Sequence, residues 1–365
     1  MVAKCGQKGP SRVVHAYFKE RILTASQFPF SALRLVSLAG LVASLAGCAA
    51  LAPVAPPPPN DPVSLRINVF RGSSNIPIYM AMERGDFARR GITPVLQFTP
   101  NSTQQREGLA TGKFEIAVAA VDNAVHVIEV AKQNAVIVAG GDGGMNEMMV
   151  RPEINRVADV RGKTFVVDAP NTAYALIGRK IFKNAGLVDG QDYKLNPLGG
   201  TEARTKSLET PAGPATMLNP PWSFVAKERG AKSLGRTIDL FGPYQASGVY
   251  VMRPWAAANS GALERFLGAY IDGCRATLNS ANRAQVVAVL QKSFQLDKAK
   301  AELTYEALTT PGHGLNKDCA MNMEGFKNVL ALRAEMEGQW GGVAPAADKF
   351  LDLSFYQRAL QHAGR

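Results

Sequence analysis

The sequence predicts an α/β protein of two units, in which each unit is a mostly parallel sheet flanked by helices. Three observations lead to this prediction. Short apolar runs alternate with amphipathic helical segments from about residue 64 onward. This alternation starts again after about residue 150, and the chain becomes mostly helical from residue 259 to its end. The chain of 365 residues is also long enough for two domains of ordinary size.

The first unit is expected to contain alternating strands and helices. The pattern S-x-x-Q at Ser102 has the form of a capping box, so a helix should begin there with Ser102 as its cap. Asp122 or Asn123 should cap the helix that follows. The predicted strands are 65–70, 95–98, 115–120 and 136–139, and the predicted helices are 76–84, 102–111 and 123–132.

The second unit repeats this order. Asn171 or Thr172 should cap a helix that continues to Asn184, and Gly186 should end it. The boundary between the units is expected near 147–156, with a return to the first unit near 242–248. The predicted strands are 164–168, 192–198, 215–218 and 248–252, and a further helix is expected at 201–209.

The glycine-rich segment 140–144 does not match a nucleotide-binding loop. It lacks both the G-x-G-x-x-G order and the trailing Lys-Ser/Thr of a P-loop. We expect it to let the backbone turn tightly near a hinge between the units.

The N-terminal segment has the features of an export signal. The apolar run 33–46 is shorter than the ~20 residues that span a bilayer, and basic residues precede it. The sequence Leu-Ala-Gly-Cys at 45–48 resembles the lipobox of bacterial lipoproteins, which implies cleavage before Cys48 and attachment of lipid to it. The alternative is an ordinary cleaved signal with an incidental cysteine. The proline-rich segment 53–62 then suits an extended spacer between anchor and domain.

Charge and cysteine content restrict the class of function. The net charge of +11 falls to +6 without residues 1–47, because that leader carries six basic residues and one acidic one. The basic residues are scattered, so we expect no nucleic-acid binding. The basic balance favours an anionic small ligand. No His or Cys spacing fits a metal site. Cys274 and Cys319 could form a disulfide in an oxidising compartment, or be buried free thiols.

Four stretches carry a resemblance to a known family. They are IPIYMAMERGDFARRGI at 76–92, GLATGKFEIAV at 108–118, VRGKT at 160–164, and RPWA at 253–256 followed by ALERFLGAY at 262–270. In order and spacing they resemble the periplasmic substrate-binding proteins of ABC importers, in the branch for nitrate, sulfonate, taurine and thiamine precursors. Glu115 stands where that family usually has Asp. The resemblance covers about residues 64–335.

The resemblance implies a type II periplasmic binding protein-like fold, in which two lobes joined by two strands close on a ligand. It also implies a non-enzymatic, monomeric, periplasmic protein without a cofactor, whose partners are a small molecule, an ABC permease with its ATPase, and the membrane through its lipid. The expected organisation is a signal peptide at 1–47, a linker at 48–63, a first lobe at 64–148 and 246–365, and a second lobe at 149–245.

Physical reasoning places the ligand beyond the carboxyl ends of the strands, where helix N-termini offer free N–H groups. Most of the polar residues there could equally be helix caps. Tyr174 could instead be a core aromatic, and Arg71 could be a solvated surface residue. Trp222 could pack between the lobes instead of stacking on a planar ligand. The expected ligand-binding residues are Arg71, Ser73, Ser74, Asn75, Ser102, Asp122, Asn123, Asn171, Thr172, Tyr174, Thr201 and Trp222.

Two other functions stay open at this point. An enzyme on the same fold is one, although the chain lacks the cysteine-rich motif of thiamine-pyrimidine synthases and shows no nucleophile–base constellation. A lipoprotein sensor that binds ligand and signals to a receptor is the other. The ligand itself is not fixed by sequence, and nitrate, alkyl sulfonates, pyrimidines, riboflavin-like rings and aromatic carboxylates all fit the family.

Overall fold

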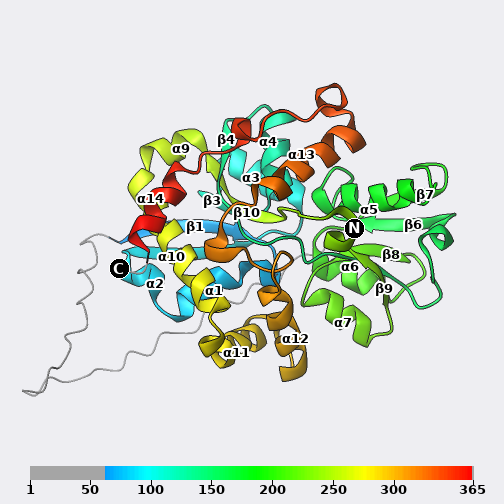
Figure 1. Ribbon diagram of the computed structural model, residues 1–365, viewed down its shortest axis with the longest axis horizontal. Coiled ribbons are helices and arrows are strands. Elements are labelled where there is room, and N and C mark those ends of the chain that lie inside the picture. The colour runs from blue at the N-terminus through cyan, green and yellow to red at the C-terminus, as the bar shows by residue number, and fades with distance from the viewer. Residues whose placement is uncertain (1–61, 364–365) are drawn as a thin grey trace, which may run out of the picture. The chain divides into compact units, whose positions relative to one another are not determined.

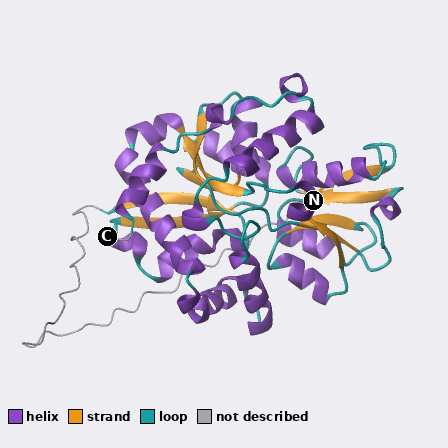
Figure 2. Cartoon of the chain, in the orientation of Figure 1, coloured by secondary structure: helices purple, strands orange, loops and turns teal. Residues whose placement is uncertain are grey.

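The structure, a computed structural model, describes residues 62–363. The predicted signal peptide, Cys48 and most of the proline-rich linker lie outside these residues. Two five-stranded sheets form the framework, and helices cover the faces of both (Figures 1 and 2). Within residues 62–363, no helix is both long enough and apolar enough to cross a bilayer.

The first sheet has the strand order β2-β1-β3-β10-β4. Strands β1, β2 and β3 pair in parallel, whereas β10 is antiparallel to both β3 and β4. The strands are β1 (Val63–Val69), β2 (Ile92–Phe98), β3 (Ile116–Ala120), β4 (Ala135–Ala139) and β10 (Ser247–Met252). The helices of this lobe are α1 (Ile76–Glu83), α2 (Asp86–Arg89), α3 (Ser102–Ala110), α4 (Val121–Glu129), α9 (Arg253–Ala258), α10 (Ser260–Leu278), α11 (Arg283–Phe294), α12 (Lys298–Thr309), α13 (Met323–Glu337) and α14 (Ser354–His362).

The second sheet repeats this plan with the order β7-β6-β8-β5-β9. Here β5 is the strand that runs antiparallel to its neighbours. The strands are β5 (Glu147–Val150), β6 (Lys163–Val167), β7 (Tyr193–Pro197), β8 (Ala215–Leu218) and β9 (Lys232–Arg236), and the helices are α5 (Ala173–Asn184), α6 (Thr201–Ser207), α7 (Trp222–Glu228) and α8 (Thr237–Phe241).

We call the part built on the first sheet lobe 1 and the part built on the second sheet lobe 2. The chain passes between them through 140–146 and returns through 242–246. Lobe 2 was expected to begin at residue 149, and its first strand, β5, begins at Glu147. The return to lobe 1 was expected at residue 246, and strand β10 begins at Ser247. Two strands were not predicted. The run EMMV of β5 lacks β-branched residues before its last position, and β9 is a polar edge strand.

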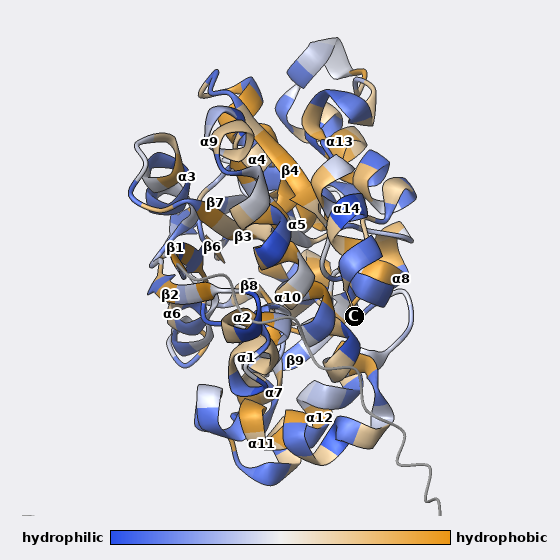
Figure 3. Ribbon diagram, turned by 90° about the vertical axis from the view of Figure 1, so that its left-hand side faces the viewer, coloured by the Kyte–Doolittle hydropathy of each residue, from blue (hydrophilic) through white to orange (hydrophobic). Residues whose placement is uncertain are grey.

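The core of lobe 1 forms where α10 packs on the sheet and on α1. Side chains on one face of α10, such as Leu263, Phe266 and Tyr270, are buried completely. Gly273 brings α10 so close to α1 that a Cβ there would lie 1.9 Å from the carbonyl oxygen of Pro77. Strand β4 is buried along its whole length and appears as a hydrophobic arrow in Figure 3.

The glycine-rich segment lies at the crossing between lobes, as expected, but mainly for a different reason. Only Gly144 has a left-handed backbone, with φ +93°. Gly140, Gly141 and Gly143 are required by close approach, because a Cβ on each would lie 2.2 to 2.3 Å from Ala320 O, Ser247 Oγ and Gly312 O respectively. The C-terminal segments therefore pack directly against the hinge.

Of the three capping predictions, two were wrong and one was correct in position. The cap of α3 is Asn101, whose Oδ1 accepts the Gln104 N–H at 2.8 Å, so Ser102 is the first helical residue. Gln105 turns inward instead and accepts a hydrogen bond from the hydroxyl of Tyr250. The N-cap position of α4 is Ala120, and Asp122 pairs with an arginine instead of capping the helix. Thr172 is the N-cap residue of α5, as predicted, but its Oγ1 donates to Ala169 O at 2.9 Å and does not cap the helix N–H groups.

Cys274 and Cys319 are both free and buried. Cys274, on α10, donates to Asn316 O at 3.4 Å and lies in contact with Cys319, the last residue of the 3-10 turn Lys317–Cys319. Burial and this contact raise the pKa of the Cys319 thiol. The disulfide stays a prediction, now between two adjacent side chains.

Candidate ligand-binding site

A cavity of about 70 Å³ lies where the two lobes meet. The strands determine its position. Its wall is formed by residues at or just after the carboxyl ends of β1, β3, β4, β6 and β8, and by residues at the start of the antiparallel β10. The polar and charged residues of the wall are Arg71, Ser74, Asn75, Ser102, Asn123, Asp142, Asp168, Thr172, Tyr174, Thr201, Arg204, Asn219 and Ser247.

Eight of the expected residues line this cavity. They are Arg71, Ser74, Asn75, Ser102, Asn123, Thr172, Tyr174 and Thr201. Arg71 does so only in part, since its side chain is exposed and its guanidinium lies 4.2 Å from the centre of the Phe98 ring. Asn75 uses its side-chain amide to hold the Phe70 carbonyl at 2.7 Å.

The other four expected residues lie outside the cavity wall. Ser73 Oγ donates to Pro220 O at 2.7 Å, and Trp222 Nε1 donates to Arg71 O at 2.8 Å, so both join the lobes. Asp122 forms a buried ion pair with Arg333, with Nη1 and Oδ1 2.6 Å apart. Asn171 accepts from Arg106 and, through its backbone carbonyl, from Arg333.

Three buried polar atoms of residues in the cavity wall have no hydrogen-bond partner within the described residues. They are Asn123 Oδ1 from lobe 1, and Arg204 Nε and Asn219 Oδ1 from lobe 2. An unpaired buried donor or acceptor costs roughly 1–3 kcal/mol. Both lobes therefore present hydrogen-bonding capacity to the cavity that the protein itself does not use.

Arg204 provides the cation of the cavity. It lies one helical turn after Thr201 on α6, so both side chains point toward the same cavity. Its Nη1 donates to Met217 O at 2.9 Å, and its guanidinium lies 5.4 Å from the centre of the Tyr174 ring. Full burial lowers its pKa, against the opposing effect of Asp168.

Two carboxylates accompany this cation. Asp142, in the hinge segment, accepts the Ser247 hydroxyl and the Gly144 N–H, and its burial raises its pKa. Asp168, directly after β6, accepts the backbone N–H of Ser102 on both oxygens, at 3.2 and 3.1 Å. The cavity is thus lined by charges of both signs.

The lobes are in contact on the open side of the cavity. Besides the Ser73 and Trp222 contacts, the N–H of Gly200 donates to Pro100 O at 2.8 Å. Each of these bonds joins the end of a strand in one lobe to the end of a strand in the other. The structure is therefore that of a closed form, in which the cavity is covered by both lobes.

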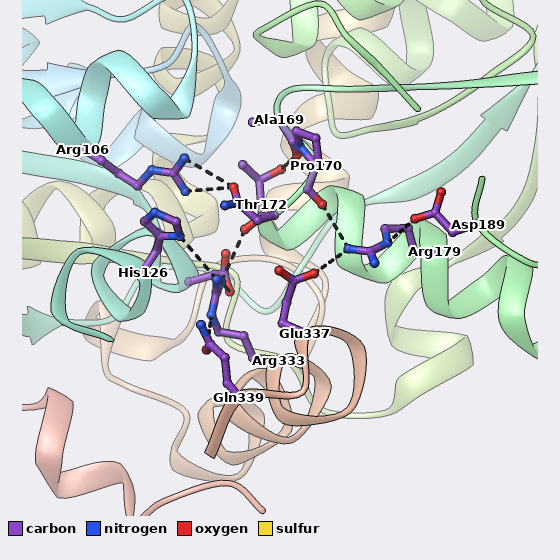
Figure 4. A network of polar contacts seen from close by, with 12 residues as sticks. Arg106, His126, Ala169, Pro170, Thr172, Arg179, Asp189, Arg333, Glu337 and Gln339 are labelled. Carbon is purple, nitrogen blue, oxygen red and sulfur yellow. Dashed lines mark hydrogen bonds and ion pairs between the residues drawn. The ribbon is translucent and has the colours of Figure 1, made fainter. Parts of the chain in front are cut away.

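A second set of polar contacts joins the lobes behind the cavity, and Figure 4 shows it. Arg333 of α13 contacts Asp122 and His126 of lobe 1 and the backbone carbonyl of Asn171 of lobe 2. Farther along α13, Glu337 pairs with Arg179 of α5 at 2.5 Å. Burial and the positive charges of Arg106 and Arg333 lower the pKa of His126 to about 3.

Sequence reasoning missed Asp142, Asp168, Arg204 and Ser247 as cavity residues. It placed Asn219 in a ligand-contacting loop, 219–222, without naming it as a binding residue. Asp168 had a usable signal, since it is the last residue of the predicted strand 164–168, but it was counted as part of the strand and not of the loop after it. Arg204 could have been found from its spacing, because it lies one helical turn after Thr201. Asp142 and Ser247 had no local signal, because the tertiary fold joins residues far apart in the chain.

The fold is that of a periplasmic binding protein-like protein. A family model described as NMT1/THI5 like matches residues 73–284, and the chain belongs to this family. No curated protein matches the chain significantly. Among solved structures, the periplasmic nitrate-binding protein NrtA from Synechocystis PCC 6803 is similar with a TM-score of 0.70 at 13% identity, over 83% of this chain and 90% of that one.

Two further solved structures show that proteins of different function share this fold. The alkanesulfonate-binding protein SsuA from Xanthomonas axonopodis pv. citri, bound to MOPS, has a TM-score of 0.63 at 17% identity, over 82% of this chain and 98% of that one. The desulfurization enzyme DSZB has a TM-score of 0.58 at 13% identity, over 82% and 99%. At these identities the likeness establishes the fold alone, and an enzyme shares it.

Proposed function

We propose that this protein is the solute-binding component of an ABC import system, which captures a small organic molecule between its lobes and delivers it to a membrane permease. The observation that carries the proposal is the closed cavity with unpaired buried polar atoms from both lobes. A ligand that pairs with Asn123 on one side and Asn219 on the other stabilises the closed form, because it contacts both lobes only there. Family membership supports the same function.

The cavity also supports a planar ligand. Tyr174 lies in its wall, as expected, whereas Trp222 lies outside it and joins the lobes instead. We therefore assign any aromatic contact with the ligand to Tyr174. The expected preference for an anion rested on net charge, and the two carboxylates of the cavity wall argue against extending it to the site.

A thermal-shift screen of the purified protein tests the binding function. The panel comprises nitrate, alkyl sulfonates, pyrimidines, riboflavin-like rings and aromatic carboxylates. A ligand that binds only the folded state raises the melting temperature according to its concentration relative to its Kd. A rise with one class identifies the cargo, whereas an unchanged melting temperature across the panel contradicts binding of these solutes.

A pair of variants locates the binding. Asn219→Ala should weaken the affinity for the identified solute about 2- to 10-fold, which corresponds to one hydrogen bond of about 0.5–1.5 kcal/mol. Asn196→Ala, on an exposed position of β7 in the same lobe, should leave Kd unchanged. Equal effects of both variants would place the solute elsewhere.

Uptake separates a transporter component from a sensor. Cells that lack this protein should lose uptake of the labelled solute if it supplies a permease. Normal uptake, together with a lost transcriptional or behavioural response to the solute, would favour the sensor.

We also propose that the protein is exported and anchored by lipid on Cys48, with a monomeric binding domain outside the membrane. This rests on the lipobox-like segment before Cys48 and on the proline-rich spacer after it. Metabolic labelling with a fatty acid should mark the wild-type protein and not Cys48→Ser. Equal labelling of both would contradict the anchor.

A further inference from the structure

The charges that face the cavity are not equally available to a ligand. Arg71 is exposed and stacks on Phe98, outside the enclosed space. The buried charged residues of the wall are Asp142, Asp168 and Arg204, which are 2%, 8% and 2% exposed. The charge of the ligand therefore has to match two carboxyl groups and one guanidinium.

Asp142 is occupied by the protein. Ser247 and Gly144 both donate to its carboxyl group, and its burial favours the neutral form. It ties the two hinge crossings together, because Asp142 belongs to one crossing and Ser247 follows the other. We assign it a structural part in the hinge.

Asp168 has unused acceptor capacity. An ionised carboxylate offers about four lone-pair sites. Within the described residues, its two oxygens share only one donor, the N–H of Ser102, and no side chain forms a salt bridge with it. The nearby Arg204 acts on Asp168 through space and directs its own Nη atoms to Met217 O and Thr201 Oγ1.

The unpaired buried atoms of the cavity wall also call for a ligand that donates hydrogen bonds. Asn123 Oδ1 and Asn219 Oδ1 are acceptors, whereas Arg204 Nε is the one unpaired donor among the buried polar atoms of the cavity wall that the structure describes. The side chains that carry them are at least nine-tenths buried, at 1%, 5% and 2% exposure. The wall thus needs a ligand with more donors than acceptors.

We infer that the ligand is a small molecule with N–H donors that is cationic or amphoteric, and that Asp168 is the residue that selects for this charge. Its donors bind Asp168 and the asparagine oxygens, and an acceptor binds Arg204 Nε. A simple oxyanion would be placed beside a buried carboxylate that no side chain pairs with directly, which is unfavourable at low dielectric. This inference rests on the proposed solute-binding function.

Matched pairs of probes test the charge preference on the full-length protein. Benzamidinium and benzoate have the same skeleton and opposite charge, and acetamidinium and acetate form a smaller pair. We expect benzamidinium or acetamidinium to raise the melting temperature by several degrees, and the matching anion to leave it unchanged. A larger or equal rise with the anions would overturn the inference while supporting solute binding.

The variant Asp168→Asn isolates the charge. Its amide oxygen still accepts the Ser102 N–H, so the contact between lobes is retained while the negative charge is lost. Affinity for the cationic probe should fall about tenfold or more, and the preference over the anion should disappear. Glu209→Gln, which removes one charge from an exposed pair with Arg229 in the same lobe, should change neither.

The outcomes separate the two proposals. Unchanged cation affinity in Asp168→Asn would overturn the assignment of Asp168 and leave solute binding standing. Failure of both probe pairs and of the whole solute panel to stabilise the protein would overturn solute binding and the charge inference together.

Discussion

Ser102 and Asp168 face each other across the two lobes. The N–H of Ser102, the first residue of α3, donates to both carboxylate oxygens of Asp168, at 3.2 and 3.1 Å. A carboxylate at a helix N-terminus is favoured by the free N–H groups and by the helix dipole. The second lobe therefore supplies a charged partner to a helix of the first, and only when the lobes are closed.

Breaking this contact should open the protein. Asp168→Ala removes the acceptor, and we expect it to disfavour the closed form by about 1.5–3 kcal/mol, the usual contribution of a hydrogen bond to a charged group. The check is the radius of gyration of the unliganded protein in solution scattering, which should increase.

The matched variant for this contact is Ser102→Pro. It removes the donor, and proline is well tolerated at the first helical position. It should produce the same opening, and the double variant should open no further than either single one. Additive effects would show that Ser102 and Asp168 act independently.

The buried ion pair between Arg333 and Asp122 should be sensitive to the loss of one partner. Their side chains are 0% and 2% exposed. Arg333→Met leaves Asp122 as an unpaired buried charge, and we expect a loss of about 3–5 kcal/mol in the free energy of unfolding, measured with denaturant.

Two further variants test whether the loss of stability comes from the unpaired buried charge. Adding Asp122→Asn to Arg333→Met should recover part of the loss, because the unpaired charge is then gone. Arg236→Met, in the exposed pair with Asp239, should change stability by about 0–1 kcal/mol. Similar losses in both arginine variants would indicate that burial does not matter here.

Stability should fall with acid through His126. Burial and the charges of Arg106 and Arg333 lower its pKa to about 3 in the folded protein, from an ordinary value of 6.5. Between these values the unfolded chain binds a proton that the folded protein does not, so the free energy of unfolding falls as pH falls from 6.5 toward 3. Denaturant unfolding across this range should show a smaller slope in His126→Gln than in the wild type. His362→Gln, at the exposed end of α14, should keep the wild-type slope.

The close packing of α10 on α1 should tolerate no added methyl group. A Cβ at Gly273 would lie 1.9 Å from Pro77 O, so Gly273→Ala should lower the melting temperature, with a loss of about 1–3 kcal/mol. A Cβ at Gly261, in the first turn of the same helix, would meet no atom nearer than 4.0 Å, the distance to Arg265 Nη1. Gly261→Ala should therefore be neutral or stabilise by up to about 1 kcal/mol. A loss at Gly261 as large as that at Gly273 would refute the steric explanation.

The periodicity of the sequence was sufficient to predict the fold class and most elements. Parallel strands such as β3 and β6 are apolar runs between helices, and these were found because they are buried on both faces. The strands β5 and β9 were missed, because one is short and rich in methionine and the other is a polar edge.

The candidate site was predictable only as far as strand ends define it. Residues in the loops after strands, such as Ser74 and Thr172, were found in this way. Which of those side chains face the ligand depends on partners distant in sequence. Asp122 satisfied every local criterion for a cap or a ligand contact, yet Arg333, 211 residues away, binds it.

The bond from Trp222 to the Arg71 carbonyl gives the protein an optical property. Of its three tryptophans, Trp222 is the one whose indole N–H is donated across the mouth of the cavity, while Trp255 and Trp340 lie in segments of lobe 1. Separation of the lobes breaks this bond and changes the surroundings of this half-buried indole, and it leaves the other two tryptophans within lobe 1. The ultraviolet fluorescence of the unlabelled protein therefore reports its own opening and closing, and a solute sensor could be read without an attached dye.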